Sequence, residues 1–176
     1  VLVQYLRHEW SYDQQSPHAG QIWRAFNETI ADGSVLTQDA NTHSALGPAL
    51  KEDLPEVLDY TRLYNRNENS VTSIMPERPI KLEGAWMVDP GFLRLFPQQF
   101  LQGNPQGVLD EPFRVILTQS AAQILFPGQK AMGKDLQVNG GVFEGKYTVQ
   151  GIVADPPQNT HLKFNVLFSL RTRYAA

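Results

Sequence analysis

Cysteine is absent from this sequence of 176 residues. Its absence excludes a disulfide scaffold, a thiol nucleophile and a zinc site with cysteine ligands, although an oxidising compartment stays open. No apolar run approaches the roughly 18 residues that a membrane-spanning helix needs. The opening residues VLVQYLRHEW contain neither a Met nor the charged start and apolar centre of a leader peptide. Together with the abrupt end at Ala175-Ala176, this leads us to expect a fragment of a longer protein.

Charge of one sign is not concentrated anywhere in the chain. It carries 15 Lys and Arg against 18 Asp and Glu, a formal net charge of −3, and its basic residues are scattered singly. We therefore expect no nucleic-acid partner and no basic patch for anionic lipid. A chain of this length forms one domain or two small ones and buries about 70% of its unfolded surface, which suffices for a proper core.

The stretch NGGVFEGKY has the G-x-x-x-x-G-K spacing of a phosphate-binding P-loop between Gly140 and Lys146. A working loop needs Ser or Thr after the lysine to bind Mg²⁺, and a helix that begins there to hold the phosphates. Tyr147 takes the place of Ser or Thr, and the following KYTVQGIVADPP predicts a strand. We interpret the stretch as a hairpin connection between DLQV and KYTVQGIV, with Gly140 or Gly141 at positive φ. No nucleotide or other cofactor is expected.

The first part of the chain predicts a β–α–β arrangement. Residues 1–13 have a helical stripe of apolar side chains, and QIWRAFNETI favours a strand. Residues 34–41 are predicted as a polar loop. A short helix is expected over 43–54, with Thr42 as its cap, before the strand-like run VLDYTRLYN. The polar, proline-flanked stretch 66–79 is predicted as a loop and is the best candidate boundary.

The second part predicts short strands and short helices. IKLEGAWMV favours a strand whose one face carries Ile80, Leu82, Gly84 and Trp86. DPGFLRLF follows as a short helix, with Asp89 as its N-cap and Pro90 at its first position.

Two further strands are expected from FRVILT, which should be buried, and from KFNVLFSL near the end of the chain. Thr118 is expected to cap the helix SAAQILF, which Pro127-Gly128 ends.

Residues that could carry chemistry are present, but they form no constellation. His8-Glu9 suggests the zinc motif H-E-x-x-H, yet Tyr12 stands in place of the second His. The histidines stand alone, the acidic residues suit a solvated helix end, and the serines lack a G-x-S-x-G elbow. Trp23 and Trp86 are interpreted as core residues. We therefore predict no catalytic, cofactor-binding or metal-binding residue among the groups considered: His8, His18, His43, His161, Glu52, Asp53, Glu56, Asp59, Ser11, Ser16, Ser44, Ser73, Ser120 and Ser169.

Five segments in order resemble one family. They are YLRHEWSYDQQSPHAGQIWRAFN, VLDYTRLYNRN, AWMVDPGFLRLFPQQFLQGNP, RVILTQSAAQILFPGQKAMGKDLQVNG and YTVQGIVADPPQNTHLKFNVLFSL. Together they are similar to the extracytoplasmic (periplasmic) core domain of MacB-type and FtsX-like ABC transporter permeases, from about Tyr5 to Leu170. Each segment alone is a weak signal, and the order of all five carries the resemblance.

The resemblance implies an α+β fold with short helices and a mixed sheet. Residues 1–13 would continue a transmembrane span outward as a stalk helix. Residues 14–75 with 158–176 would form a porter-like α+β lobe, and residues 76–157 a smaller, β-rich, Sabre-like lobe. The full-length protein would lie in the inner membrane, with this domain on its periplasmic, extracytoplasmic side.

The function that the resemblance implies is mechanical and not enzymatic. ATP would be bound by a cognate ATP-binding subunit, a second permease copy would complete a dimer, and an accessory adaptor or an exported substrate would be further partners. The domain would relay ATP-driven motion across the membrane, in export, efflux or mechanotransmission. An extracytoplasmic sensor or ligand-binding module is the main alternative and would need a closed pocket with convergent polar groups. A hydrolase with dispersed carboxylates or serines is a third reading.

Overall fold

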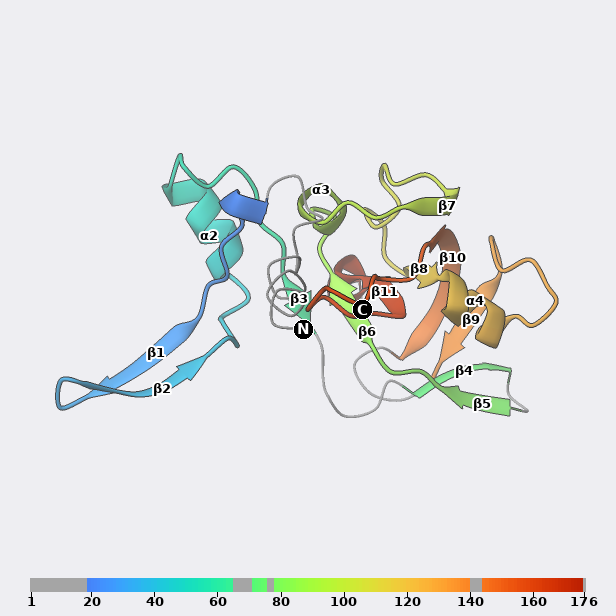
Figure 1. Ribbon diagram of the computed structural model, residues 1–176, viewed down its shortest axis with the longest axis horizontal. Coiled ribbons are helices and arrows are strands. Elements are labelled where there is room, and N and C mark those ends of the chain that lie inside the picture. Colours follow the sequence, from blue (N-terminus) through green and yellow to red (C-terminus); the bar gives the residue numbers. More distant parts are fainter. Residues whose placement is uncertain (1–18, 65–70, 76–77, 140–143, 176) are drawn as a thin grey trace, which may run out of the picture.

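The computed structural model describes residues 19–64, 71–75, 78–139 and 144–175 (Figure 1). Within them the chain forms a nine-stranded mixed sheet, a separate two-stranded hairpin and a few short helices. The strands are β1 (Asn27–Ala31), β2 (Ser34–Asp39), β3 (Leu63–Tyr64), β4 (Val71–Met75), β5 (Arg78–Lys81), β6 (Ala85–Val88), β7 (Phe100–Gly103), β8 (Arg114–Thr118), β9 (Asp135–Val138), β10 (Gly145–Val153) and β11 (Val166–Ser169). The helices are α2 (Leu46–Asp53), α3 (Phe92–Leu95) and α4 (Gln119–Leu125), with 3₁₀ turns η1 (Ala19–Gln21) and η3 (Leu170–Tyr174).

The large sheet runs in the order β3-β6-β11-β8-β10-β9-β4-β5. At its centre β11 pairs in parallel with β6 and antiparallel with β8, and β8 pairs in parallel with β10. The long strand β10 also pairs with β9 near its start and with β7 near its end. Parallel and antiparallel pairs thus share one sheet beside short helices, which confirms the predicted α+β class with a mixed sheet.

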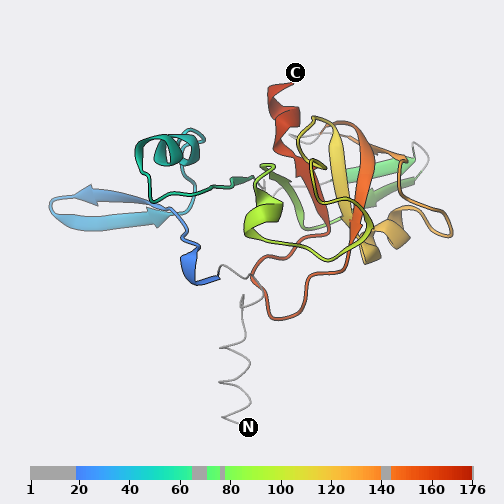
Figure 2. The ribbon, with the colours of Figure 1, turned by 90° about the horizontal axis from the view of Figure 1, so that it is seen from above.

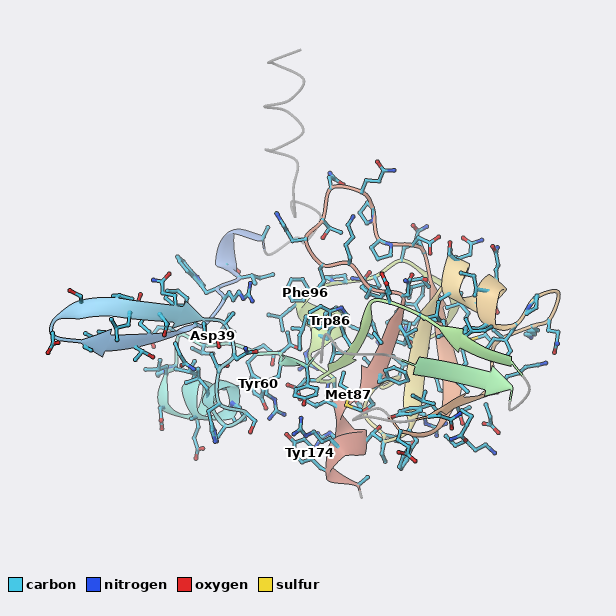
Figure 3. The ribbon with its side chains drawn as sticks, turned by 90° about the horizontal axis from the view of Figure 1, so that it is seen from below. Asp39, Tyr60, Trp86, Met87, Phe96 and Tyr174 are labelled. Carbon is cyan, nitrogen blue, oxygen red and sulfur yellow. The ribbon has the colours of Figure 1, made fainter. Side chains whose placement is uncertain are left out.

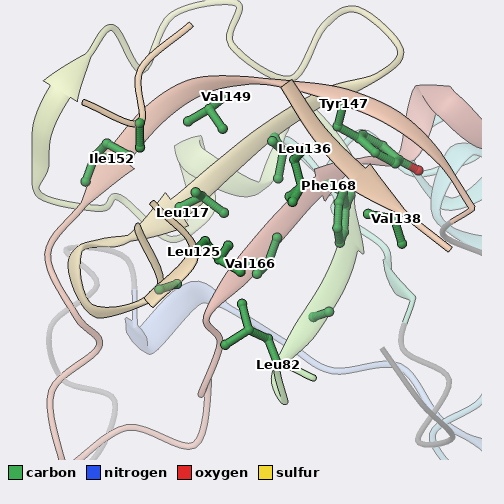
Figure 4. Packing of buried hydrophobic residues seen from close by; sticks show 14 of the residues in the cluster. Leu82, Leu117, Leu125, Leu136, Val138, Tyr147, Val149, Ile152, Val166 and Phe168 are labelled. Atoms are coloured by element: carbon green, nitrogen blue, oxygen red, sulfur yellow. The ribbon is translucent and has the colours of Figure 1, made fainter. Parts of the chain in front are cut away.

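Both faces of the central strands are buried. Along β8, Val115 and Leu117 belong to one core cluster and Ile116 to the other, because successive side chains of a strand point to opposite faces. Helix α4 contributes Leu125 to the first cluster (Figure 4), and α3 contributes Phe92 to the second. A strand covered on both sides needs a continuous apolar run, and this confirms that FRVILT is a buried strand.

The turn from β8 into α4 has the helix cap that its sequence predicts. Thr118 is the N-cap of α4, and its hydroxyl accepts a hydrogen bond of 3.2 Å from the N–H of Ala121. The helix ends at Leu125, before Gly128 at φ +68°. Further on, β9 and β10 pair antiparallel, with Gly145 opposite Val138. The predicted cap, helix end and strand pair are confirmed, while the glycines Gly140 and Gly141 lie outside the described residues.

Strand β7 approaches β10 closely because it ends in glycine. Gly103 has φ +92°, and a Cβ atom built on it would stand 2.5 Å from the carbonyl oxygen of Gln150. A side chain is excluded both by this contact and by the left-handed backbone. Gly103 therefore permits the pairing of β7 with β10.

Two stretches that were predicted as loops are in part strands. Residues 34–39 form β2, which pairs antiparallel with β1, and the stretch 66–79 contains β4 and the start of β5. Polar composition suggested loops, but an antiparallel partner satisfies the backbone N–H and C=O groups of both segments. These two predictions were wrong because strand pairing is a contact between segments and not a property of one segment.

The predicted face of IKLEGAWMV is also wrong. Gly84 has φ +70° and interrupts the strand between β5 and β6. Leu82 and Met87 belong to one core cluster, whereas Trp86 packs against the other. A single period of two cannot be carried through a left-handed residue, so Leu82 and Trp86 lie on different faces.

Residues 19–58, which we call the arm, extend away from the large sheet (Figures 1 and 2). The arm holds η1, β1, β2 and α2, and none of its residues is buried. Trp23 is 89% exposed and Leu58 82% exposed, so the prediction of Trp23 as a core residue was wrong. The predicted helix over 43–54 is present as α2, but Ala45 stands at its N-cap in place of Thr42.

Strands from both predicted lobes share the large sheet. Strands β3 and β11, which the prediction assigns to the porter-like lobe, lie beside β6 of the Sabre-like lobe. The lobe boundaries, 14–75 with 158–176 and 76–157, stay a prediction. The predicted stalk helix, residues 1–13, lies outside the described residues.

Candidate functional site

The P-loop-like stretch leads into a strand and cannot hold a nucleotide in the manner of a P-loop. Lys146 lies on β10, and its Nζ is 2.8 Å from Oδ2 of Asp135 on the neighbouring β9. Tyr147 is completely buried, with its ring packed between Phe113 and Phe168. Its hydroxyl cannot reach a Mg²⁺ ion in solvent, and Lys146 is not at the start of a helix. The prediction of a strand after the glycines is confirmed.

The histidines within the described residues stand apart from one another. His43 is exposed at the start of the α2 turn, where its Nδ1 accepts a hydrogen bond of 3.2 Å from the N–H of Ala45. His161 is exposed on the connection to β11. His8 and His18 lie outside the described residues. In the part of the chain that the structure describes, no three His, Asp or Glu side chains gather where they could hold a metal ion.

The acidic residues near α2 separate into exposed groups and one paired group. Glu52, Asp53 and Glu56 are exposed. Asp59 instead pairs with Arg94 at 2.8 Å and with Lys51 at 3.2 Å. Partial burial of Asp59 acts to raise its pKa, but hydrogen bonds from Arg94, the N–H of Tyr60 and Lys51 outweigh it and hold the pKa below its usual range. This carboxylate is stabilised in its charged form, which suits an ion pair and not a general acid.

Ser120 and Ser169 make structural hydrogen bonds. The hydroxyl of Ser169 donates to the carbonyl of Leu109 at 2.7 Å in the core. Ser120 donates its hydroxyl to Asp155 at 2.7 Å and its N–H to the same carboxylate at 3.1 Å. Neither hydroxyl is hydrogen-bonded to a histidine, so neither is arranged as an activated nucleophile. Ser11 and Ser16 lie outside the described residues.

Asp155 and Ser120 also line an open hollow of about 530 Å³, together with Glu83, Gly84, Pro156, Lys163, Phe164 and Asn165. The side chains of Ser120, Asp155, Lys163 and Asn165 are hydrogen-bonded within the protein. Lys163 donates to the carbonyls of Pro157 and Gln158 at 2.5 and 2.8 Å, and the Asn165 amide donates to the carbonyl of Glu83 at 2.9 Å. The hollow is therefore a feature of the surface whose polar groups hold loops together, and it offers no convergent set of free groups.

A denser polar cluster lies where the arm meets the large sheet. We call it the junction, and it consists of Ser44, Tyr60, Arg62, Asp89 and Tyr174. Arg62 donates from Nε to Oδ2 of Asp89 and from Nη2 to Oδ1, each at 2.7 Å, and its own N–H donates to Oδ2 at 2.9 Å. The Asp89 side chain is only 11% exposed and that of Arg62 is 25% exposed. This is a two-pronged, largely buried ion pair, the geometry for which the planar guanidinium is suited.

The third nitrogen of the Arg62 guanidinium, Nη1, contacts two other segments. It donates to the carbonyl of Ser44 at 2.9 Å, in the turn before α2, and to the hydroxyl of Tyr174 at 3.3 Å, in η3. The guanidinium also lies 5.8 Å from the ring centre of Tyr60 and 5.9 Å from that of Tyr174. Both tyrosines are labelled in Figure 3. The hydrogen bonds that Arg62 donates to Asp89 raise the already high pKa of Arg62, so it is charged at every physiological pH.

Sequence reasoning missed the junction and gave Asp89 another role. The N-cap of α3 is Gly91, without a side-chain hydrogen bond, and the carboxylate of Asp89 faces Arg62 instead. The backbone carbonyl of Asp89 accepts the N–H of Phe92 at 2.9 Å, so the turn forms as expected although the cap does not. Arg62 and Asp89 are 27 positions apart, and nothing local in either segment indicates the pair.

This arrangement of a mixed sheet with short helices belongs to a class of domains known from transporter permeases. The family model of the MacB-like periplasmic core domain matches residues 2–176. The chain belongs to that family, a family of periplasmic domains of ABC transporter permeases, and the resemblance found in the sequence is confirmed. No curated protein sequence matches the chain. Among the described residues, no helix is long and apolar enough to cross a bilayer.

Solved structures of three other proteins are similar to this chain. A domain assigned to a permease protein from Porphyromonas gingivalis superposes with a TM-score of 0.58 at 18% identity, over 72% of this chain and 56% of that one. The periplasmic region of MacB from Actinobacillus actinomycetemcomitans gives 0.51 at 14% identity, over 72% and 54%. The extracellular domain of the noncanonical ABC-type transporter YknZ from Gram-positive bacteria gives 0.42 at 14%, over 62% and 55%. This chain thus matches 56% and 54% of the first two, and at these identities the likeness concerns the fold.

Proposed function

We propose that this domain has no enzymatic activity and relays ATP-driven motion of an ABC transporter permease to a substrate or an accessory protein outside the membrane. The arrangement of a well-packed sheet and an extended arm, in a chain that belongs to a permease family, carries the proposal. A sheet buried on both faces carries an arm that extends away from it (Figure 1), and the Arg62–Asp89 ion pair lies where the two meet. A well-packed sheet transmits displacement because close-packed interiors deform little.

The proposed partners follow from membership of the family. A cognate ATP-binding subunit would act through the transmembrane part, and a second permease copy would form the other half of a dimer. Residues 1–13 would serve as the stalk, with the domain on the periplasmic side of the inner membrane. An accessory adaptor or an exported substrate would meet the domain there. The stalks would move the domain as a whole, with its two predicted lobes, 14–75 with 158–176 and 76–157, joined through the large sheet.

The proposal is tested by comparing a cross-link, which restrains motion, with alanine substitutions, which remove polar side chains. In the full-length permease, a cross-link between the two stalks near His8 is expected to block transport-dependent phenotypes. Alanine substitutions at His18, His43, Glu52, Asp53 and His161 are expected to leave them largely intact at matched expression. If one of these alanine variants abolishes activity in a folded, membrane-inserted protein while the cross-link has no effect, the relay is wrong and a site around that residue takes its place.

A further inference from the structure

The arm has little to hold it except the short segment that follows it. None of residues 19–58 is buried, so the arm shares no core with the sheet. Its helix α2 packs on Tyr60, since a Cβ atom built on Gly47 would stand 2.6 Å from the Tyr60 ring. A surface element without buried apolar contacts is free to change its orientation unless specific polar contacts hold it.

Arg62 makes those contacts to three segments that are distant in the sequence. It meets Asp89 at the end of β6, Ser44 in the turn that begins α2, and Tyr174 in η3 after β11. β6 and β11 are neighbours in the sheet, so Asp89 and η3 extend from adjacent strands. One guanidinium thus connects the arm to two adjacent ends of the sheet.

We infer that Arg62 is the joint that fixes the orientation of the arm relative to the sheet. With Arg62 paired to Asp89, the turn at Ser44 is held against the sheet, and the arm and the sheet move as one body. Without this pair the arm keeps its own hairpin and helix but turns about residues 59–62, which connect it to β3. The inference deepens the proposed function, on which it rests only for the claim that this movement serves transport.

Only the planar guanidinium group of an arginine can hold the arm in this way. It engages both oxygens of Asp89 and still has Nη1 for Ser44 and Tyr174. The ammonium group of lysine is a point charge that cannot span these acceptors. Because the Asp89 side chain is 11% exposed, water does not readily replace a lost donor there.

A second ion pair in the same region provides a matched control. Arg94 pairs with Asp59 at 2.8 Å, but its side chain is 64% exposed. Water can replace the contacts of an exposed arginine at little cost. Arg94→Lys therefore changes the same residue type, within the same region, without removing a largely buried contact.

The absence of cysteine allows the arm to be followed with two spin labels. We place one at Asp53→Cys on α2 and one at Gln123→Cys on α4, both at exposed positions. The distribution of distances between the labels is then measured in four proteins: the parent, Arg62→Lys, Asp89→Asn and Arg94→Lys. Circular dichroism and urea unfolding show whether the sheet is intact in each.

Arg62→Lys and Asp89→Asn are expected to broaden the distribution by roughly twofold or more, because the arm then samples orientations that the joint excludes. Arg94→Lys should leave its width unchanged. Distributions as narrow as that of the parent in both junction variants would overturn the inference, and so would equal broadening by Arg94→Lys. Asp89→Asn keeps the test decisive if Arg62→Lys does not fold.

The label distances do not depend on transport and therefore separate the joint from the proposed function. In the full-length permease, Arg62→Lys is expected to impair transport-dependent phenotypes while ATP hydrolysis continues. If the distance distribution broadens but transport is undiminished, Arg62 fixes the arm as inferred, and the claim that this orientation serves transport is wrong. A narrow distribution with impaired transport would overturn the joint and leave the relay standing.

Discussion

The ring centres of Tyr147 and Phe168 lie 4.5 Å apart in the core, although β8 separates their strands β10 and β11 in the sheet (Figure 4). The hydroxyl of Tyr147 is buried there and has no hydrogen-bond partner of good geometry. Burial raises the pKa of this hydroxyl to about 12, against a smaller lowering effect of the nearby Thr172. The ring contributes packing, whereas the hydroxyl contributes a desolvation cost.

Tyr147→Phe is therefore expected to leave the free energy of unfolding within about 1 kcal/mol of the parent or to raise it, since the buried hydroxyl is lost with no partner left behind. Tyr147→Ala, in contrast, should cost about 3–5 kcal/mol because it creates a cavity beside Phe168. Urea unfolding at neutral pH measures both. A loss for the Phe variant as large as for the Ala variant would show that the hydroxyl makes an important hydrogen bond.

The same hydroxyl predicts a loss of stability at high pH. Its folded pKa of about 12 lies above the ordinary value of 10.0, so the folded state keeps the proton longer than the unfolded chain does. The unfolded state therefore binds fewer protons as the pH rises from about 10 to 12, and unfolding becomes easier there, by at most about 1.4 kcal/mol per pH unit. Below pH 10 this contribution is complete. Tyr147→Phe should show a shallower decline than the parent over this range, and urea unfolding at a series of pH values measures both.

We expect no specific binding of ATP by this chain. Lys146 pairs with Asp135 on the neighbouring strand and Tyr147 is buried, so neither residue is placed as the lysine or the Mg²⁺ ligand of a P-loop. Calorimetry with Mg-ATP is the measurement, with Lys146→Ala as the comparison. Micromolar affinity that depends on Mg²⁺ and disappears in Lys146→Ala would contradict the prediction. The ion pair itself is exposed, so the substitution should barely change stability.

Gly103 and Gly128 separate the cost of a left-handed backbone from the cost of a steric contact. Both have positive φ, +92° and +68°, but a Cβ on Gly103 would stand 2.5 Å from the carbonyl oxygen of Gln150, while one on Gly128 would meet nothing within 4 Å. Gly128→Ala should cost about 1–2 kcal/mol from the backbone alone. Gly103→Ala should cost clearly more, because β7 must also move away from β10. Equal losses in urea unfolding would contradict this account of the close approach.

Several local signals predicted the structure well, although the expected caps Thr42 and Asp89 do not cap their helices. The continuous apolar run of FRVILT predicted a strand buried on both faces, and Thr118 followed by SAAQILF predicted a capped helix. The glycines before KYTVQGIV predicted a turn between strands and not a nucleotide loop. These features depend on a few neighbouring residues, whose backbone preferences and periodicity act within the segment itself. The order of five such segments was sufficient to indicate the family.

Features that depend on distant partners were decided only in the tertiary structure. Residues 34–39 form a strand because β1 pairs with them. Trp23 is apolar enough for a core, but it lies on the arm, which has no buried residue. Asp89 had the position of a helix cap in the sequence, but a charge 27 positions away offers its carboxylate a two-pronged partner in a site with little water. The sequence by itself determined the family and those elements, such as β8 and α4, whose signals lie within their own residues. The ion pair of Arg62 and Asp89 exists only in the folded protein, because folding brings the two residues together and removes most of the water around them.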